Sequence, residues 1–99
     1  MSTVHLEVLS SLAETLDSQS ESVKIEQEIE EGATVRDVLN RLSTGYPRFI
    51  AVIFDIKAQK QTEKVNIFLN GRNLELEYGL ATRLHEDDTL TFVTPIVGG

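Results

Sequence analysis

One amphipathic helix, flanked by segments in which apolar and polar residues alternate, limits the fold of this chain more than any other feature. Thr34 is a residue type that begins helices, and Asp37 follows three positions later in a variant of the capping box. The apolar residues follow the i, i+3, i+4, i+7 rule of a helix with one buried face, at Val35, Val38, Leu39 and Leu42. Gly45 is the expected end of this helix.

Two segments before the helix alternate with a period of two residues, which is typical of strands with one buried face. In the first segment the two faces hold Val4, Leu6 and Val8 against His5, Glu7 and Leu9. In the second they hold Val23, Ile25, Gln27 and Ile29 against Lys24, Glu26, Glu28 and Glu30. We expect the two segments to form a hairpin with its charged face in water. Docking of the glutamates to a basic groove is the alternative.

The segments after the helix predict a second hairpin and a final strand. Residues 65–70 alternate and lead into Asn70-Gly71, which is the strongest short signal for a type I′ turn. Leu74 and Leu76 are expected on the returning strand. After a short turn over residues 78–84 and a charged turn over 85–88, residues 89–93 form the last strand. Its inward side chains are expected to be Leu90 and Phe92.

Three stretches are less regular. Residues 10–22 are interpreted as a connection with a short helical turn. Pro47 opens a second helical piece whose spacing continues through Phe49, Val52, Ile53 and Ile56, with a strand over 50–54 as the alternative. The polar residues 55–64 are expected to form a surface loop. The fold class is therefore α+β, with a mixed sheet covered by one main helix.

Composition restricts the function. The 99 residues, 40% of them hydrophobic, indicate one domain, and the absence of cysteine excludes disulfides, zinc ribbons and thiolate nucleophiles. A net charge of −7 disfavours nucleic acid and anionic membranes as partners. The alternative is that the charge serves only to keep the protein soluble. We see no signal peptide and no membrane-spanning run, so cytoplasm is the expected location.

The last residues form a separate unit. We expect a folded domain over residues 1–95 and a flexible tail over 96–99, because Pro95 cannot donate to a sheet ladder. The tail, extended, would reach roughly 13 Å at ~3.3–3.6 Å per residue. Its tip, Gly98-Gly99, has no side chains and can enter a narrow tunnel. A frayed terminus is the alternative reading of the two glycines.

Three segments together carry a family resemblance. Residues 65–72, the pattern Gly79-Leu80 with Thr82 and Leu84, and the terminus from Phe92 to Gly99 resemble the ubiquitin-like sulfur carriers of the MoaD/ThiS family. Within it they look most like the small subunits of molybdopterin synthase. Two positions depart from the family pattern: Asp87 stands where glycine is usual, and Thr94 precedes Pro95 in place of a second proline.

The resemblance implies a ubiquitin-like β-grasp fold and chemistry at one carboxylate. An E1-like adenylyltransferase would use ATP and Mg²⁺ to adenylate Gly99, and a sulfur donor system would convert the acyl-adenylate to a thiocarboxylate. The large subunit of molybdopterin synthase, in a heterotetramer, would then receive the tail with its sulfur for cyclic pyranopterin monophosphate. The chain itself would bind no cofactor and would have no independent catalytic site.

Partner contacts are expected beside the tail. The candidate residues are Phe68, Arg72, Val93, Pro95, Ile96 and Val97. The sheet face that carries Phe68 and Val93 is implied by the resemblance to be the recognition surface, although Phe68 could instead pack under residues 55–64. A solvated side chain is the alternative for Arg72. His5 and His85 stand in neither metal-site nor catalytic-triad spacing.

Other functions remain open at this point. Gly99 could instead form an isopeptide bond with lysines of target proteins, as ubiquitin does. The sulfur could also serve thiamine thiazole or cysteine synthesis. A third class is an interaction domain with an incidental Gly-Gly end.

Overall fold

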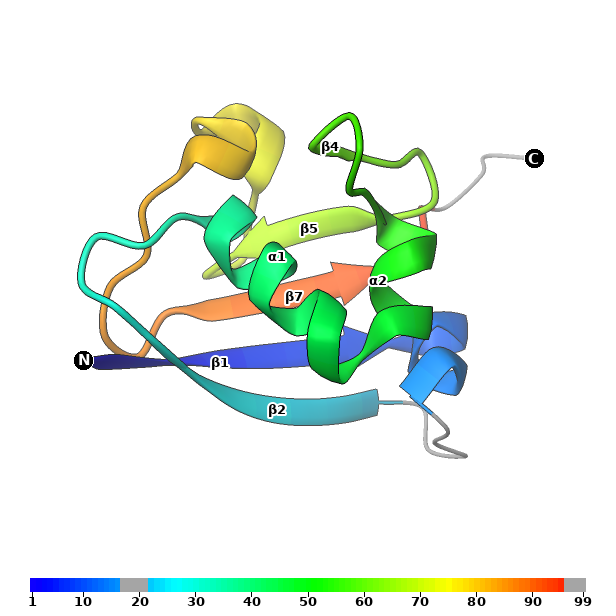
Figure 1. The fold of residues 1–99 in the computed structure, drawn as a ribbon, viewed down its shortest axis with the longest axis horizontal. Coiled ribbons are helices and arrows are strands. Elements are labelled where there is room, and N and C mark those ends of the chain that lie inside the picture. Colours follow the sequence, from blue (N-terminus) through cyan, green and yellow to red (C-terminus); the bar gives the residue numbers. More distant parts are fainter. Residues whose placement is uncertain (17–21, 96–99) are drawn as a thin grey trace.

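The first and last strands of the described chain lie side by side at the centre of a five-stranded sheet (Figure 1). The computed structural model describes residues 1–16 and 22–95. The sheet order is β2-β1-β7-β5-β6, comprising Ser22–Ile29, Ser2–Leu9, Thr89–Val93, Asn66–Leu69 and Arg72–Asn73. β1 runs parallel to β7 and antiparallel to β2, and β5 runs antiparallel to both β7 and β6. The predicted mixed sheet and N-terminal hairpin are confirmed.

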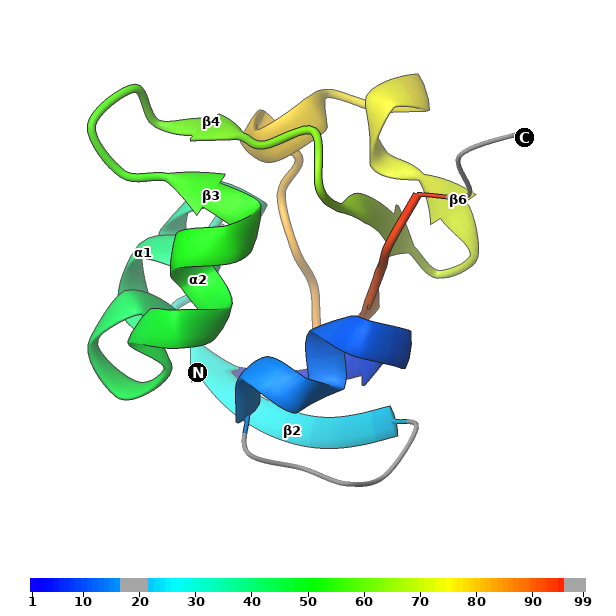
Figure 2. The ribbon, with the colours of Figure 1, turned by 90° about the vertical axis from the view of Figure 1, so that its right-hand side faces the viewer.

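Two consecutive helices, α1 (Val35–Gly45) and α2 (Pro47–Ile53), cover one face of the sheet (Figures 1 and 2). The predicted capping box is present: Asp37 N–H donates to Thr34 Oγ1 at 3.2 Å, and Thr34 N–H donates to Asp37 Oδ2 at 2.9 Å. The second helical piece is also confirmed. No helix in the described ranges is both long and apolar enough to cross a membrane.

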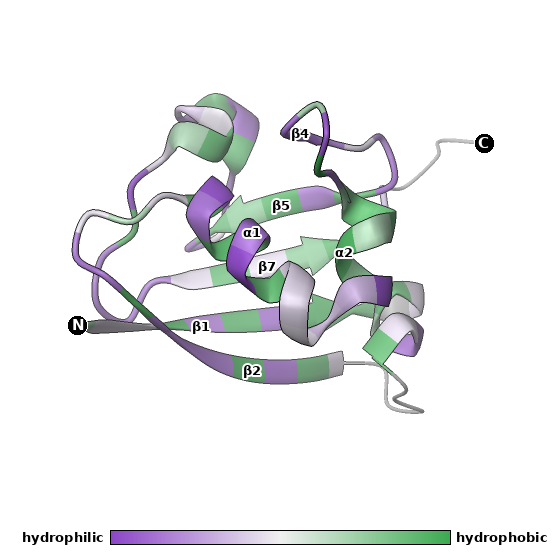
Figure 3. Ribbon diagram, in the orientation of Figure 1, coloured by the Kyte–Doolittle hydropathy of each residue, from purple (hydrophilic) through white to green (hydrophobic). Residues whose placement is uncertain are grey.

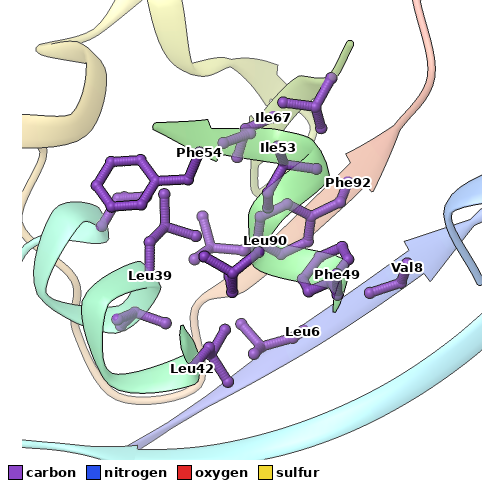
Figure 4. Packing of buried hydrophobic residues seen from close by; sticks show 14 of the residues in the cluster. Leu6, Val8, Leu39, Leu42, Phe49, Ile53, Phe54, Ile67, Leu90 and Phe92 are labelled. Carbon is purple, nitrogen blue, oxygen red and sulfur yellow. The ribbon is translucent and has the colours of Figure 1, made fainter. Parts of the chain in front are cut away.

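The hydrophobic core lies between these helices and the inward face of the sheet (Figure 4). All four residues of the predicted helical stripe are buried, as are Leu90 and Phe92 of β7. Phe49 of α2 packs edge-on against Phe92, with ring centroids 5.3 Å apart and an interplanar angle of 85°. Aromatic pairs favour this geometry because the positive edge of one ring meets the negative face of the other. The contact joins α2 directly to β7.

The outward face of β2 is charged, as the alternation predicted. Lys24, Glu26 and Glu28 are exposed, whereas Val23 and Ile25 pack against the core. Figure 3 shows this alternation as bands of opposite hydropathy along the strand.

The Asn70-Gly71 turn has the predicted geometry, since the φ angles are 51° at Asn70 and 85° at Gly71. The returning strand is shorter than expected. β6 ends at Asn73, and a 3₁₀ helix, η2 (Leu74–Leu76), follows because the Asn73 side-chain oxygen accepts the N–H of Glu75 at 2.9 Å. Leu74 is buried but Leu76 is 75% exposed. Placing both leucines on the strand was therefore wrong.

The segment after α2 also differs from the prediction. The helix ends at Ile53, and Ile56, expected on its apolar stripe, is 50% exposed. Phe54–Asp55 (β3) instead pairs with Lys60–Gln61 (β4), so residues 54–61 form a short two-stranded arm rather than a plain loop. Asp55 Oδ1 accepts the N–H of Ala58 at 3.0 Å, which begins the turn of this arm.

A pair of side-chain amides fixes the arm to α1. Asn40 donates to Gln59 Oε1 at 2.9 Å, and Gln59 donates to Asn40 Oδ1 at 3.1 Å. Gln59 Nε2 also donates to the carbonyl of Ile56 at 2.8 Å. These contacts hold Gln59 at a φ of 54°, in the left-handed region.

The remaining connections contain short 3₁₀ helices. The predicted helical turn after β1 is η1 (Ser10–Leu16), whose Leu12 is buried in the core. The rest of that connection, residues 17–21, lies outside the described residues. η3 (Gly79–Ala81) occupies the turn predicted over 78–84.

Candidate functional site at the end of the last strand

β7 leaves the sheet at Val93, three residues before the predicted tail of residues 96–99. Val93 is the last paired residue of β7, opposite Asn66 of β5, and Thr94 and Pro95 follow without ladder pairing. Pro95 has no N–H to donate, so the ladder cannot continue through it. The other predicted site residues of the tail lie outside the described residues: Ile96, Val97, Gly98 and Gly99.

Two surface hollows flank Pro95, which lines both of them. The first lies between η1, α2 and the residues before β5, and is lined by Ser11, Leu12, Thr15, Val52, Glu63, Lys64, Thr94 and Pro95. The second lies toward η2 and is lined by Gln61, Thr62, Glu63, Val65, Asn66, Glu75 and Pro95. Sequence reasoning did not find these neighbours, because they come from four separate segments that only the tertiary fold brings together.

Phe68 and Val93 share the outward face of the sheet. Phe68 lies opposite Thr91 and Val93 lies opposite Asn66, so the two residues are diagonal neighbours across β5 and β7. Each is half-buried, and Ile67 beside Phe68 is in the core. Phe68 therefore faces away from the helices.

Leu9 belongs to the same face and was not among the predicted site residues. The parallel register pairs Val8 with Phe92, which puts Leu9 next to Val93 on the outward side. Leu9 is half-buried. The alternation of residues 4–9 already placed Leu9 on this face and could have identified it.

Arg72 lies away from the end of β7. It pairs with Leu69, at the opposite end of β5 from the pairing of Asn66 with Val93. Its Nε donates to Glu77 Oε1 at 2.8 Å, although its side chain is 70% exposed. The guanidinium therefore has a partner within the chain and is not simply solvated. The structure does not bring it together with Phe68 and Val93 at the base of the tail.

The two histidines each approach carboxylates. His5 Nε2 lies 3.1 Å from Asp87 Oδ1 and its Nδ1 lies 3.9 Å from Glu26 Oε1. His85 Nδ1 lies 3.8 Å from Asp88 Oδ2. Within residues 1–16 and 22–95, no three histidine, cysteine, aspartate or glutamate side chains are placed to hold a metal ion together.

Comparison with known proteins identifies the family. Residues 8–99 match the ThiS family. The chain belongs to the ThiS family. Membership in this family of ubiquitin-like sulfur carriers confirms the resemblance inferred from the sequence. No curated protein matches the sequence closely enough to add to this result.

Solved structures support the β-grasp fold of this ThiS-family chain. Small archaeal modifier protein 1 from Methanosarcina acetivorans is 29% identical, with a TM-score of 0.73 and coverage of 100% of this chain and 98% of that one. The protein of the same name from Haloferax volcanii is 23% identical, with a TM-score of 0.74 and coverage of 98% and 99%. A putative molybdopterin converting factor subunit 1 from Pyrococcus furiosus is 21% identical, with a TM-score of 0.70 and coverage of 97% and 100%.

The departure from the family pattern at Asp87 has a structural explanation. Asp87 has a φ of 65°, the left-handed conformation in which glycine is usual. Aspartate tolerates this region better than most residues because its short side chain bonds to nearby groups. Here the carboxylate meets His5, and the Asp87 N–H donates to the carbonyl of Thr3 at 2.8 Å. The turn before the last strand thus keeps a glycine-type geometry without glycine.

Proposed function

We propose that this chain carries sulfur as a thiocarboxylate on Gly99 and serves as the small subunit of molybdopterin synthase. The observation that supports this proposal is the arrangement along the chain. A ThiS-family domain is followed by a last strand that ends before Pro95 and then by Gly98-Gly99. The likeness to a putative molybdopterin converting factor subunit supports this branch of the family.

The chemistry needs little from the chain beyond its terminal carboxylate. That group is ionised at neutral pH and is a poor acyl donor. An E1-like adenylyltransferase, using ATP and Mg²⁺, joins it to AMP and releases pyrophosphate. A sulfur nucleophile from the donor system then attacks the acyl carbon, AMP leaves, and sulfur remains on Gly99. Gly98 and Gly99 carry no Cβ, so the reacting carbon can pass a narrow entrance.

In this proposal the large subunit of molybdopterin synthase binds both the tail and the sheet face beside it. Leu9, Phe68 and Val93 supply apolar contact area on that face, and Pro95 fixes where the chain leaves it. Ile96 and Val97 contact the walls of the channel that admits the glycines. Two small and two large subunits form the heterotetramer.

The second candidate is a protein modifier. The likeness to small archaeal modifier protein 1, at 29% identity over the whole chain, favours it specifically. The same activated Gly99 would then be joined to lysines of target proteins. Sulfur delivery to thiamine thiazole or cysteine synthesis uses the same intermediate and differs in the receiving enzyme.

Intact mass measurement of the protein isolated from its own cells tests the carrier proposal. We expect a species in which one oxygen is replaced by sulfur, and mass spectrometric fragmentation should place that change on Gly99. A variant without Gly99 should lack it. If the native protein carries no sulfur under conditions of active cofactor synthesis, and instead forms a ladder of conjugates on an immunoblot, the modifier replaces the carrier.

Copurification then distinguishes the receiving enzyme. A complex with a molybdopterin synthase large subunit supports the branch proposed here. A tight complex with a thiazole synthase or a cysteine-forming synthase would reassign the pathway while leaving the thiocarboxylate chemistry intact.

A further inference from the structure

The long edge of the sheet at β2 has backbone groups that no described strand pairs. Among the described residues, β2 is hydrogen-bonded to β1 on one side, and its other side forms the border of the sheet. Such an edge over eight residues is a template for pairing with another chain. Natural edges of this length usually carry charges that repel a second strand, so the arrangement of charges decides what can bind.

The hydrogen bonds of β1 show which backbone groups point outward. The Asp87 N–H donates to the carbonyl of Thr3 at 2.8 Å, and the His5 N–H donates to the carbonyl of Asp88 at 2.8 Å. Thr3 and His5 therefore direct their backbone groups toward the β7 side of β1, away from β2. In antiparallel pairs, residues opposite such positions also direct their N–H and C=O away from the partner strand.

On β2 the residue opposite Thr3 is Glu28 and the residue opposite His5 is Glu26. With a period of two, the outward backbone groups belong to Ser22, Lys24, Glu26 and Glu28. Gln27 Nε2 donates to the carbonyl of Glu28 at 3.0 Å, so one of these carbonyls has a local side-chain donor. The side chains of the four residues lie on the exposed, outward face of the sheet.

We propose that this edge binds a second copy of the chain, with the two β2 strands antiparallel about a twofold axis at Ile25. In that register Lys24 lies opposite Glu26 of the second copy, and Ser22 lies opposite Glu28. Both pairs occur twice because the interface is isologous. In this register all four residues with outward backbone groups, from Ser22 to Glu28, have a partner in the second copy. Each charged residue among them faces either an opposite charge or a serine.

The neighbouring registers are disfavoured by charge. A shift of two residues toward the start of β2 places Lys24 opposite Lys24, and a shift of two toward its end places Glu26 opposite Glu26. Directly opposed like charges destabilise a strand pair, whereas opposite charges stabilise it. On the other face of the strand, the chosen register brings Ile25 against Ile25, both already packed against the core of their own domain.

The net charge of −7 opposes self-association, so the dimer is expected to be weak and dependent on local pairing. At 0.15 M ionic strength the screening length is ≈ 8 Å, which reduces repulsion between distant charges more than it weakens the adjacent Lys24–Glu26 pairs. The edge is separated from β7 by β1, so this inference is independent of the proposed chemistry at Gly99.

The test measures self-association by sedimentation equilibrium at protein concentrations up to about 1 mM, a range that detects dimers with dissociation constants up to about 1 mM. We expect concentration-dependent dimerisation of the unmodified chain. Lys24→Glu and Glu26→Lys should each weaken it about tenfold or more, because each variant opposes like charges twice. The double variant K24E/E26K should restore it, since the pairs are reversed but still opposite in sign.

An equimolar mixture of the two single variants gives the sharpest readout. In the mixed dimer each Glu of one chain faces a Lys of the other, so the mixture should associate although neither variant does so alone. If net charge alone governed self-association, the result would differ. Glu26→Lys changes the net charge from −7 to −5 and would then strengthen dimerisation instead of weakening it.

Lys60→Glu on β4 serves as the matched control, because it changes the net charge as Lys24→Glu does but lies outside the edge. It should dimerise like the unmodified chain. Two results would overturn the proposal. In one, the unmodified chain stays monomeric up to about 1 mM. In the other, dimerisation of the variants follows their net charge and the mixture of Lys24→Glu with Glu26→Lys does not associate.

Discussion

His5 and Asp87 meet beside the parallel pair of strands, with His5 Nε2 3.1 Å from Asp87 Oδ1. The contact joins the first strand to the turn that precedes the last one. In the same turn the Asp87 N–H donates to the carbonyl of Thr3, and Glu86 Oε2 accepts the N–H of Thr3 at 2.8 Å. The start of β7 is therefore fixed to β1 by side-chain and backbone contacts together.

The left-handed backbone at Asp87 predicts a clear order of stability among variants. Asp87→Asn and Asp87→Gly should stay close to the unmodified chain, since both residues accept a φ of 65°. Asp87→Ala should lower the free energy of unfolding by about 1 kcal/mol relative to Asp87→Gly, because a Cβ in this region meets the following carbonyl. Urea denaturation measures the difference, and equal stability of the alanine and glycine variants would contradict the explanation.

The capping box of α1 predicts that a second substitution lowers the stability of the fold. Thr34→Ala removes the oxygen that accepts the N–H of Asp37 and should cost about 1 kcal/mol of unfolding free energy. Thr44→Ala, an exposed change of the same kind in the last turn of α1, should stay within about 0.5 kcal/mol of the unmodified chain. Equal effects of the two substitutions would show that the cap contributes nothing to stability.

Leu74 and Leu76 offer a matched pair on one short helix. Leu74 is 1% exposed and Leu76 is 75% exposed. Leu74→Ala should lower the free energy of unfolding by about 2–5 kcal/mol, through lost burial and the cavity left behind. Leu76→Ala should change it by less than about 0.5 kcal/mol. Thermal and urea denaturation of both variants measure this; a large loss at Leu76 would mean that the leucine is buried in solution.

The amide pair between Asn40 and Gln59 predicts local rather than global loosening. Asn40→Ala should speed amide hydrogen exchange in the arm of residues 54–61 more than in β1 or β7. The double variant N40A/Q59A should loosen the arm by less than the sum of the two single variants, because each single substitution already removes both hydrogen bonds between the two amides. Arg41→Ala, an exposed neighbour on α1, is the control. Uniform exchange changes across the sheet would contradict a local role.

The sequence predicted the features that depend on neighbouring residues. The Thr34–Asp37 cap and the positive φ angles at Asn70-Gly71 follow from local chemistry, and both are present. The N-terminal hairpin, the last strand and the covering helix followed from the periodicity. The family resemblance rested mainly on residues 65–72, the pattern over 79–84 and the terminus from Phe92 to Gly99, and the match to the ThiS family confirmed it.

The errors came where the spacing of apolar residues fits one element but the hydrogen bonds of the chain form another. Ile56 fits a helical stripe, but pairing of Phe54–Asp55 with Lys60–Gln61 ends the helix before it. Leu76 fits an alternating strand, but the Asn73 cap turns the chain into a 3₁₀ helix. The hollows around Pro95 combine η1, α2 and η2 with the residues before β5, and no periodicity indicates such a combination.

The central position of β7 makes assembly of the sheet depend on two strands from opposite ends of the domain, β1 and β7. β7 joins β1 to β5, so before it is made the β1–β2 hairpin and the β5–β6 hairpin have no strand between them. Contacts between residues so far apart in sequence close slowly, and only after both segments are available. A ribosome must therefore release nearly the whole domain before the sheet can assemble. A synthesis product interrupted before Thr89 would lack β7, so its two hairpins would stay unjoined and the five-stranded sheet would not form.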